Sequence, residues 1–229
     1  MHHAQPLFLL IETSSDVCSV ALARGENALV EKQTHERNHA AALAPLIESL
    51  LNENNVTVSD LACIGVNGGP GSYTGLRIGL STAKGMCFAA NKPLVMIDAL
   101  QAYAQGLLLH QPVSENEMIV STVENRRDEL FYAAFDHQLN RIQDVTLTVT
   151  TNDDLQKRLG GNCVVVGSAV AKLQSHYAPS ASLRYVDVKA SALNLLKPAL
   201  EKFNAQSYSD LAYSEPFYYK DVYIAAPKR

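Results

Sequence analysis

The sequence predicts an α/β fold of two similar lobes, and three observations lead to that prediction. Of the 229 residues, 47% are hydrophobic and 18% are charged, which is typical of a globular chain with a sizeable core. Each half of the chain gives the same predicted order of elements, βββαβαβα. A polar stretch that contains a proline, QPVSENE at 111–117, separates the halves. We therefore expect a duplicated fold with a cleft, the first lobe at residues 1–110 and the second at 111–229.

The first half begins with three short strands that are separated by the turns TSSD and RGEN. Asn38 is placed to cap a helix, because apolar residues then recur at a period of 3.6. A buried strand, LACIGVN, leads into a glycine-rich loop and a further helix. The expected strands span 7–11, 17–23, 28–34, 61–67 and 93–98, and the expected helices begin at 38, 73 and 99.

The second half repeats this order with shorter elements. Strands are expected at 118–124, 129–135, 142–149, 163–166 and 183–186, and helices at 153–159, 169–177 and 191–203. The last helix and the tail behind it are expected to pack back on the first lobe.

The glycine-rich loop NGGPGSYTGLRIG, at 67–79, stands between a predicted strand and a predicted helix. Unpaired backbone N–H groups point outward at a helix start, so such a loop is a natural anion site. The stretch matches neither G-x-x-x-x-G-K-[ST] nor G-x-G-x-x-G, since Thr74 stands where the last glycine would be. A phosphate site and a plain tight turn therefore both stay open.

The helix after this loop carries a small residue at every fourth position: Gly71, Gly75, Gly79, Ala83 and Cys87. Glycine inside a helix costs about 1 kcal/mol relative to alanine, so another backbone is expected to approach closely. That backbone belongs either to the same chain or to another subunit. We predict mainly an interface, in which a partner helix approaches to about 8 Å.

Extended to NGGPGSYTGLRIGLSTAKGM, the loop and helix resemble the signature of the bacterial TsaB (YeaZ) family. Four further stretches match that family in the same order: IETSSDVCSVAL, NHAAALAPLIESLL with His39 and Pro45, VENRRDELFYAAF, and EPFYYKDV. The resemblance implies a duplicated actin-like ATPase (ribonuclease H-like) fold. It also implies a non-catalytic role in forming N6-threonylcarbamoyladenosine at position 37 of tRNAs that read ANN codons.

In that family the protein pairs through its first lobe with a larger catalytic paralogue, TsaD. An ATPase, TsaE, joins them, and TsaC supplies threonylcarbamoyl-adenylate. The resemblance therefore implies a TsaD-like and a TsaE-like partner, a homodimer when the chain is alone, and tRNA contact through the complex only. No cofactor is assigned to the chain itself, and ATP with Mg²⁺ is left to the complex.

Two sets of site residues follow from the resemblance and the glycine loop. The expected nucleotide contacts are Glu12, Thr13, Gly68, Gly69 and Gly71. The expected partner interface comprises His39, Leu43, Leu46, Ser72, Tyr73, Gly75, Arg77, Gly79 and Ala83. We expect no catalytic residue and no metal site.

Departures from the family pattern support the non-catalytic role. The catalytic relative carries an H-x-x-x-H metal pair where this chain has Ala99 and Tyr103, which do not bind such a metal. Glu12 replaces the usual Asp, and it either bonds the following turn or orders magnesium through water. His35 and His39 have ligand spacing but no third ligand. An active small-molecule kinase of this fold and a metallopeptidase remain the alternatives.

Charge and cysteine content bound the environment. The net charge of 19 − 23 = −4, with no Lys/Arg-rich run, argues against strong binding of nucleic acid by the chain alone. Four scattered cysteines in apolar contexts predict reduced core thiols. We expect a cytoplasmic protein without membrane contact, because no apolar run is long enough to cross a bilayer.

Overall fold

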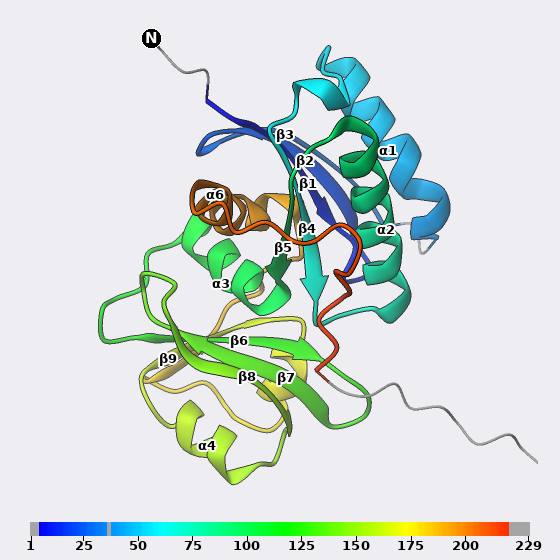
Figure 1. Cartoon of the computed structure of the whole chain (residues 1–229). Coiled ribbons are helices and arrows are strands. Elements are labelled where there is room, and N and C mark those ends of the chain that lie inside the picture. Colours follow the sequence, from blue (N-terminus) through cyan, green and yellow to red (C-terminus); the bar gives the residue numbers. More distant parts are fainter. Residues whose placement is uncertain (1–4, 36–37, 220–229) are drawn as a thin grey trace, which may run out of the picture.

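The computed structural model describes residues 5–35 and 38–219, which form two five-stranded sheets (Figure 1). The strand orders are β3-β2-β1-β4-β5 and β8-β7-β6-β9-β10, so both sheets place their strands as third, second, first, fourth, fifth. In each sheet the first three strands are antiparallel and the fourth is parallel to the first. This shared topology confirms the predicted duplication. The strands are β1 Leu7–Glu12, β2 Cys18–Arg24, β3 Asn27–Thr34, β4 Cys63–Gly69, β5 Leu94–Asp98, β6 Met118–Glu124, β7 Glu129–Phe135, β8 Arg141–Val149, β9 Cys163–Gly167 and β10 Leu183–Tyr185.

The helices of the described residues are α1 His39–Glu53, α2 Tyr73–Ala90, α3 Ala99–His110, α4 Asp153–Leu159, α5 Val170–Gln174 and α6 Leu196–Asn204. Two of them differ from the prediction. The helix expected at 191–203 is divided, because Ser191 caps a short 3₁₀ turn, Ala192–Leu195, before α6 begins. The helix expected at 169–177 is observed as the shorter α5, which begins close to the expected start and gives way to a turn after Gln174.

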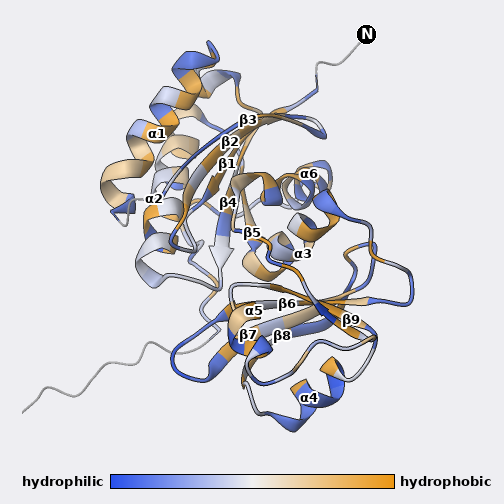
Figure 2. Cartoon of the chain, turned by 180° about the vertical axis from the view of Figure 1, so that it is seen from behind, coloured by the Kyte–Doolittle hydropathy of each residue, from blue (hydrophilic) through white to orange (hydrophobic). Residues whose placement is uncertain are grey.

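Helices α1 and α2 cover one face of the first sheet (Figure 1). Their inward residues, such as Leu43, Leu50 and Leu80, pack with Leu9 and Val66 of the strands in one apolar core. Figure 2 shows hydrophobic residues along the central strands, and the four cysteines are buried free thiols, which confirms the predicted core thiols. No helix in the described part of the chain combines the length and the hydropathy that crossing a bilayer requires.

The helices that end each half contact the opposite lobe. Ala199 of α6 packs with Phe8 and Leu10 of the first sheet, whereas Leu100 of α3 packs with Ile119 of the second. Figure 1 shows α3 lying between the two sheets, beside α6. The two halves therefore share apolar cores, and the division of domains at residues 110 and 111 stays a proposal.

After α6 the chain crosses the first lobe as a strap, residues 205–219 (orange to red in Figure 1). Ser209 donates its N–H to Leu94 O at 2.8 Å, so the strap follows the free edge of β5. It then reaches α2, where Lys84 Nζ donates to Ser214 O at 3.0 Å. Phe217 donates its N–H to Gly68 O at 2.7 Å. The strap thereby covers the ends of β4 and β5 that face the second lobe.

Candidate functional site

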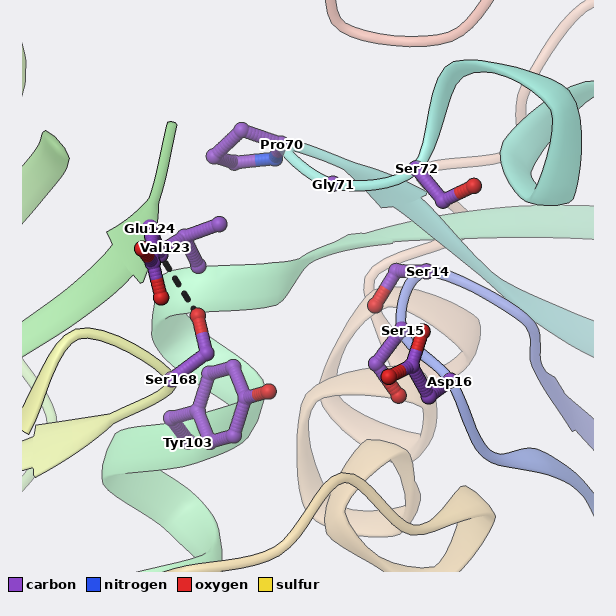
Figure 3. A pocket seen from close by; sticks show the side chains of 10 residues that line it. All are labelled: Ser14, Ser15, Asp16, Pro70, Gly71, Ser72, Tyr103, Val123, Glu124 and Ser168. Atoms are coloured by element: carbon purple, nitrogen blue, oxygen red, sulfur yellow. Dashed lines mark hydrogen bonds between the residues drawn. The ribbon is translucent and has the colours of Figure 1, made fainter. Parts of the chain in front are cut away.

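A cavity of about 270 Å³ lies between the lobes, where the β1–β2 loop, the β4–α2 loop, α3, the end of β6 and the β9–α5 loop meet. Figure 3 shows Ser14, Ser15 and Asp16 on one side of it and Glu124, Ser168 and Tyr103 on the other. The full lining is Ser14, Ser15, Asp16, Pro70, Gly71, Ser72, Tyr103, Val123, Glu124 and Ser168. Hydroxyl groups from both lobes thus face one space.

Glu12 stabilises the β1–β2 loop beside this cavity through buried hydrogen bonds. Its carboxylate accepts hydrogen bonds from the Ser14 N–H at 2.6 Å and from the Asn67 side-chain amide, and only 1% of the residue is exposed. Burial raises the pKa of Glu12, and the hydrogen bonds from Ser14 and Asn67 oppose that rise. Of the two roles expected for Glu12, the structure therefore shows the one that bonds the turn.

The glycine stripe of α2 faces this same loop. A Cβ atom added at Gly71, Gly75 or Gly79 would lie closer than 3.0 Å to atoms of Ser14 or Thr13. For Gly75 the obstructing atom is the Thr13 backbone carbonyl oxygen, which cannot rotate away. The close approach is therefore internal, and the expectation that a partner helix fills this stripe is corrected. These glycines let the β1–β2 loop of the chain's own first lobe sit directly on α2.

Most of the expected nucleotide contacts are also covered. Glu12 and Thr13 are buried, and a Cβ at Gly68 would meet the Phe217 ring of the strap. Gly69 is buried as well. Of the five residues only Gly71 lines the cavity. Local sequence gave no signal for this, because Phe217 is far away along the chain.

The expected interface residues fall into two groups. His39, Leu43, Gly75, Gly79 and Ala83 are buried, so they do not form a contact surface, and this part of the prediction is corrected. The side chains of this group, and the backbone of its two glycines, face the sheet or the β1–β2 loop. For example, a ring nitrogen of His39 lies 2.8 Å from Ser15 O.

The second group lies at the surface. Ser72, Tyr73 and Arg77 are exposed and Leu46 is half-buried. The Arg77 guanidinium stacks 4.0 Å from the Tyr73 ring centre and donates to the Tyr218 hydroxyl at 3.0 Å. Sequence reasoning missed Phe88, which is 82% exposed on α2. Its spacing of eleven residues from Arg77, about three helical turns, was the available signal.

The second lobe contributes Val123, Glu124 and Ser168 to the cavity. Glu124 forms an ion pair with Lys172 at 2.9 Å, and its N–H donates to Ser168 Oγ at 2.8 Å. Tyr103, on α3, is 6% exposed, and burial raises the pKa of its hydroxyl. The ring fills space that an open cleft would leave for a ligand.

These residues do not fit a nucleoside triphosphate with its magnesium. The cavity is smaller than the range of about 300–1,000 Å³ that is usual for ligand pockets. Asp16 repels an anion, Glu124 is already paired with Lys172, and the lining contains neither Lys nor Arg. Donors of the glycine loop are already used, since Ser72 N–H bonds Ser14 O at 2.7 Å and Gly75 N–H bonds Ser72 Oγ at 3.2 Å. Among the described residues no group of three or more His, Cys, Asp or Glu side chains is placed to hold a metal ion.

The sequence model of the family described as "TsaD: tRNA N6-adenosine threonylcarbamoyltransferase" matches residues 29–222, most of the chain. The chain belongs to this family, in its TsaB (YeaZ) branch. It is 32% identical over 127 residues to the Haemophilus influenzae tRNA threonylcarbamoyladenosine biosynthesis protein TsaB, covering 55% of this chain and 52% of that one. It is 27% identical over 165 residues to the tRNA N6-adenosine threonylcarbamoyltransferase of Sphingopyxis alaskensis, covering 65% and 46%. The match thus spans about half the length of these TsaB and TsaD relatives.

A solved Pseudomonas aeruginosa structure, described as similar to the peptidase YEAZ, superposes with a TM-score of 0.80 at 21% identity. The superposition covers 94% of this chain and all of that one. At this identity the likeness shows the fold. The architecture is therefore the duplicated actin-like ATPase fold that the TsaB resemblance implied.

Proposed function

We propose that this chain is a non-catalytic subunit in the formation of N6-threonylcarbamoyladenosine at position 37 of tRNAs that read ANN codons. It works in the cytoplasm with a TsaD-like catalytic paralogue and a TsaE-like ATPase. The observation that carries the proposal is the start of α3. Ala99, fully buried, and Tyr103 stand where the catalytic relatives have their H-x-x-x-H metal pair. A methyl group and a phenol in an apolar core supply no ligand for that metal.

The chemistry of the cavity lining also supports a non-catalytic role, because it does not suit an adenylate substrate. Transfer of an acyl group from an adenylate needs groups that receive an anionic phosphate and stabilise developing negative charge. The cavity instead presents Asp16 and Glu124, and Tyr103 closes part of it. Its chemistry therefore suits a subunit that supports catalysis elsewhere.

The partner face consists of the outer sides of α1 and α2, which lie side by side (Figure 1). On α1 the exposed residues include Ala40, Ala44 and Pro45, which are short and apolar. On α2, Phe88 is 82% exposed, and a Cβ at Gly85 would meet no atom within 4 Å. Short side chains around an exposed aromatic ring allow close helix packing with a central anchor. The same face serves a homodimer when the chain is alone, and tRNA is contacted through the complex.

Reconstitution tests the catalytic part of the proposal. The chain, threonylcarbamoyl-adenylate and tRNA are incubated without and with the TsaD-like paralogue and the ATPase, and the modified nucleoside is measured by mass spectrometry. We expect product only in the complete mixture. Product from the single chain contradicts the proposal. Tight binding and turnover of Mg-ATP by the single chain supports a kinase instead, and stoichiometric metal in the purified chain supports a metallopeptidase.

The partner face is tested with a charge at its centre. We expect Phe88→Glu to weaken association with the paralogue at least about tenfold, since it places an unpaired carboxylate in an apolar contact. Ile142→Glu is the matched control, because Ile142 is 55% exposed on β8 of the second lobe. Sedimentation measures the association, and circular dichroism checks that both variants fold. Equal effects of the two substitutions contradict the assignment of the face.

A further inference from the structure

A second cavity, of about 550 Å³, lies between α4 and the face of the second sheet that points away from α3. Figure 1 shows α4 beside β8 on this side of the lobe. The volume is within the range of about 300–1,000 Å³ that is usual for ligand pockets. The lining shares no residue with the interlobe cavity. It consists of Met118 from β6, Tyr132 from β7, Gln143 and Thr146 from β8, and Asp154, Lys157 and Arg158 from α4.

Arg158 is half-buried in this cavity and forms no ion pair with any described residue. In contrast, the partly buried Arg184 lies against the Glu117 carboxylate. One terminal nitrogen of Arg158 donates to Gln143 Oε1 at 2.8 Å, and the other contacts the Met118 sulfur at 3.8 Å. Each terminal nitrogen carries two N–H groups, so each keeps one without an acceptor. Because a cation removed from water needs a counter-charge, this guanidinium favours an anion from outside the chain.

Tyr132 adds a hydroxyl that faces the same cavity. Its ring packs with Leu155 and Leu159 of α4, and only 4% of the residue is exposed. The hydroxyl has no hydrogen-bond partner among residues 5–35 and 38–219, yet it is not one of the unpaired polar atoms that are closed to solvent, as Arg158 Nε is. A ligand in the cavity can therefore reach it. Polar groups of such buried residues are almost always paired, and a phenol readily donates to an anion.

Lys157 and Asp154 lie at the open edge of the cavity. Their side chains are 79% and 83% exposed and form an ion pair at 3.7 Å. Such exposed pairs contribute little to stability, so the ammonium is available to a ligand. The two cations, Lys157 and Arg158, oppose one carboxylate, which leaves a local charge of 2 − 1 = +1 in a chain whose net charge is −4. The cavity therefore favours an anion.

The donors match a phosphate better than a carboxylate. The fork of an arginine fits two oxygens of either group. A carboxylate offers one charge and two oxygens, whereas a phosphate monoester carries about −1.5 to −2 at pH 7 and has three terminal oxygens. Arg158, Tyr132 and Lys157 supply donors for all three oxygens, and the volume leaves room for an organic body beside them.

We propose that the α4–β8 cavity binds a small phosphate monoester. Arg158 donates its two unmatched N–H groups to the phosphate, with Gln143 holding the guanidinium in place. The Tyr132 hydroxyl donates to a further oxygen, and Lys157 approaches from the edge. This site is independent of the proposed role in tRNA modification, because it involves neither the partner face nor the interlobe cavity.

The test uses the full chain and glycerol 3-phosphate as the monoester. Titration at constant ionic strength is followed in ¹H–¹⁵N spectra, and we expect saturable shifts confined to α4 and the facing parts of β7 and β8, with a dissociation constant on the order of millimolar. Dimethyl phosphate and acetate, which carry a single charge, are expected to bind at least about fivefold more weakly. No saturable shift up to the solubility limit, or equal binding of the three compounds, overturns the proposal. Tighter binding of inorganic phosphate than of the ester overturns the assignment of an ester.

Variants of opposite expected effect separate a binding site from a structural cluster. Arg158→Gln is expected to weaken binding at least about tenfold, and Tyr132→Phe about fivefold, the values of a charged and a neutral hydrogen bond. Asp154→Asn is expected to strengthen binding about two- to fivefold, because it removes an exposed repelling charge. Lys197→Gln removes a positive charge from the exposed side of α6 and is the control that leaves binding unchanged.

Circular dichroism checks that each variant folds. If Arg158→Gln does not fold, Tyr132→Phe and Asp154→Asn still decide the matter, since unchanged binding in both of them overturns the proposal. An equal loss in Lys197→Gln and Arg158→Gln shows a response to net charge alone and overturns it as well.

Discussion

The first strand of each lobe ends in a glutamate, and the two side chains have opposite surroundings. Glu12 ends β1 and is 1% exposed, with its carboxylate bonded to Ser14 and Asn67 of its own lobe. Glu124 ends β6, has half of its side chain exposed, and pairs with Lys172 at the edge of the cavity. The same place in a repeated topology thus serves internal support in one lobe and lines the cleft in the other.

The fourth strand of each lobe ends in a glycine, which allows a second comparison between the lobes. Gly69 ends β4 with φ +104° and Gly167 ends β9 with φ +102°, a backbone conformation that side chains rarely adopt. Beyond these glycines the lobes diverge, since α2 has 18 residues and α5 has five. The long helix of the first lobe supplies both the seat for the β1–β2 loop and the proposed partner face. Duplication has therefore kept the strand endings and changed the helices that follow them.

The largest expected effect comes from the glycines that contact a carbonyl. We expect Gly75→Ala and Gly167→Ala each to lower the free energy of unfolding by about 3 kcal/mol or more, because the new Cβ would lie closer than 3.0 Å to the Thr13 or Thr122 backbone oxygen. Urea denaturation measures the loss. A loss below about 1 kcal/mol at Gly75 alone would show that the first-lobe loop yields, and that the two lobes are not equally tight there.

The pH dependence of the free energy of unfolding distinguishes Glu12 from Glu124. The pKa of Glu12 is raised in the folded chain, so Glu12 contributes most to stability while protonated, below its unfolded value of 4.5, and that contribution is lost as pH rises through the raised value. Each unit of raised pKa corresponds to about 1.4 kcal/mol. We expect Glu12→Gln to remove this part of the pH dependence of unfolding, measured by urea titration at several pH values.

Glu124→Gln is the matched control for that experiment. All other carboxyl groups are common to Glu12→Gln and the unchanged chain, so the difference between those two reports on Glu12, and Glu124→Gln shows what removal of a half-exposed glutamate does. An identical pH dependence in Glu12→Gln and in the unchanged chain contradicts the buried environment found for Glu12.

A smaller effect is expected where the strap joins the lobes. The Tyr219 hydroxyl donates to Asp98 at 3.0 Å, and Asp98 also caps α3 and lies 3.4 Å from Arg141 of the second lobe. We expect Tyr219→Phe to cost about 0.5–1.5 kcal/mol. Hydrogen exchange of the Phe217 N–H, which bonds Gly68 O, is expected to accelerate.

Tyr185→Phe provides the comparison within one lobe, since the Tyr185 hydroxyl donates to Tyr177 O at 2.8 Å in the second lobe. It is expected to leave exchange at Phe217 unchanged. Faster exchange at Phe217 in both variants would mean that the strap responds to general loss of stability and not to the Asp98 contact.

The smallest expected effect is an increase in the free energy of unfolding. Gly85 lies in α2 with no atom within 4 Å of an added Cβ, in contrast to Gly75 in the same helix. We expect Gly85→Ala to raise the free energy of unfolding by about 0.5–1 kcal/mol, because alanine loses less backbone entropy on folding. Thermal unfolding measures this change. A loss of stability in Gly85→Ala would place an unrecognised contact on the outer side of α2.

The sequence by itself determined the order of the elements. The strands are short apolar runs, continuous in β1 and with alternating large residues in β2, whereas apolar residues recur with a period of 3.6 in α1. These patterns depend only on near neighbours along the chain. The turn after β4 and the start of α2 near Tyr73 followed from the glycine-rich loop, and the structure adds that Ser72 caps the helix. The boundaries of α5 and α6 were less well predicted, because weak or divided capping there leaves the ends to tertiary packing.

Only the tertiary structure decided what the glycine stripe of α2 contacts. Its spacing shows that some backbone approaches, but Thr13 and Ser14 of the same chain and a partner helix would leave the same pattern of small residues. The cover that Phe217 places over Gly68 was likewise hidden, because a contact between residues so distant in sequence has no local periodicity. The physical reason is common to both: sequence patterns report that a surface is buried, whereas the folded chain selects which atoms bury it.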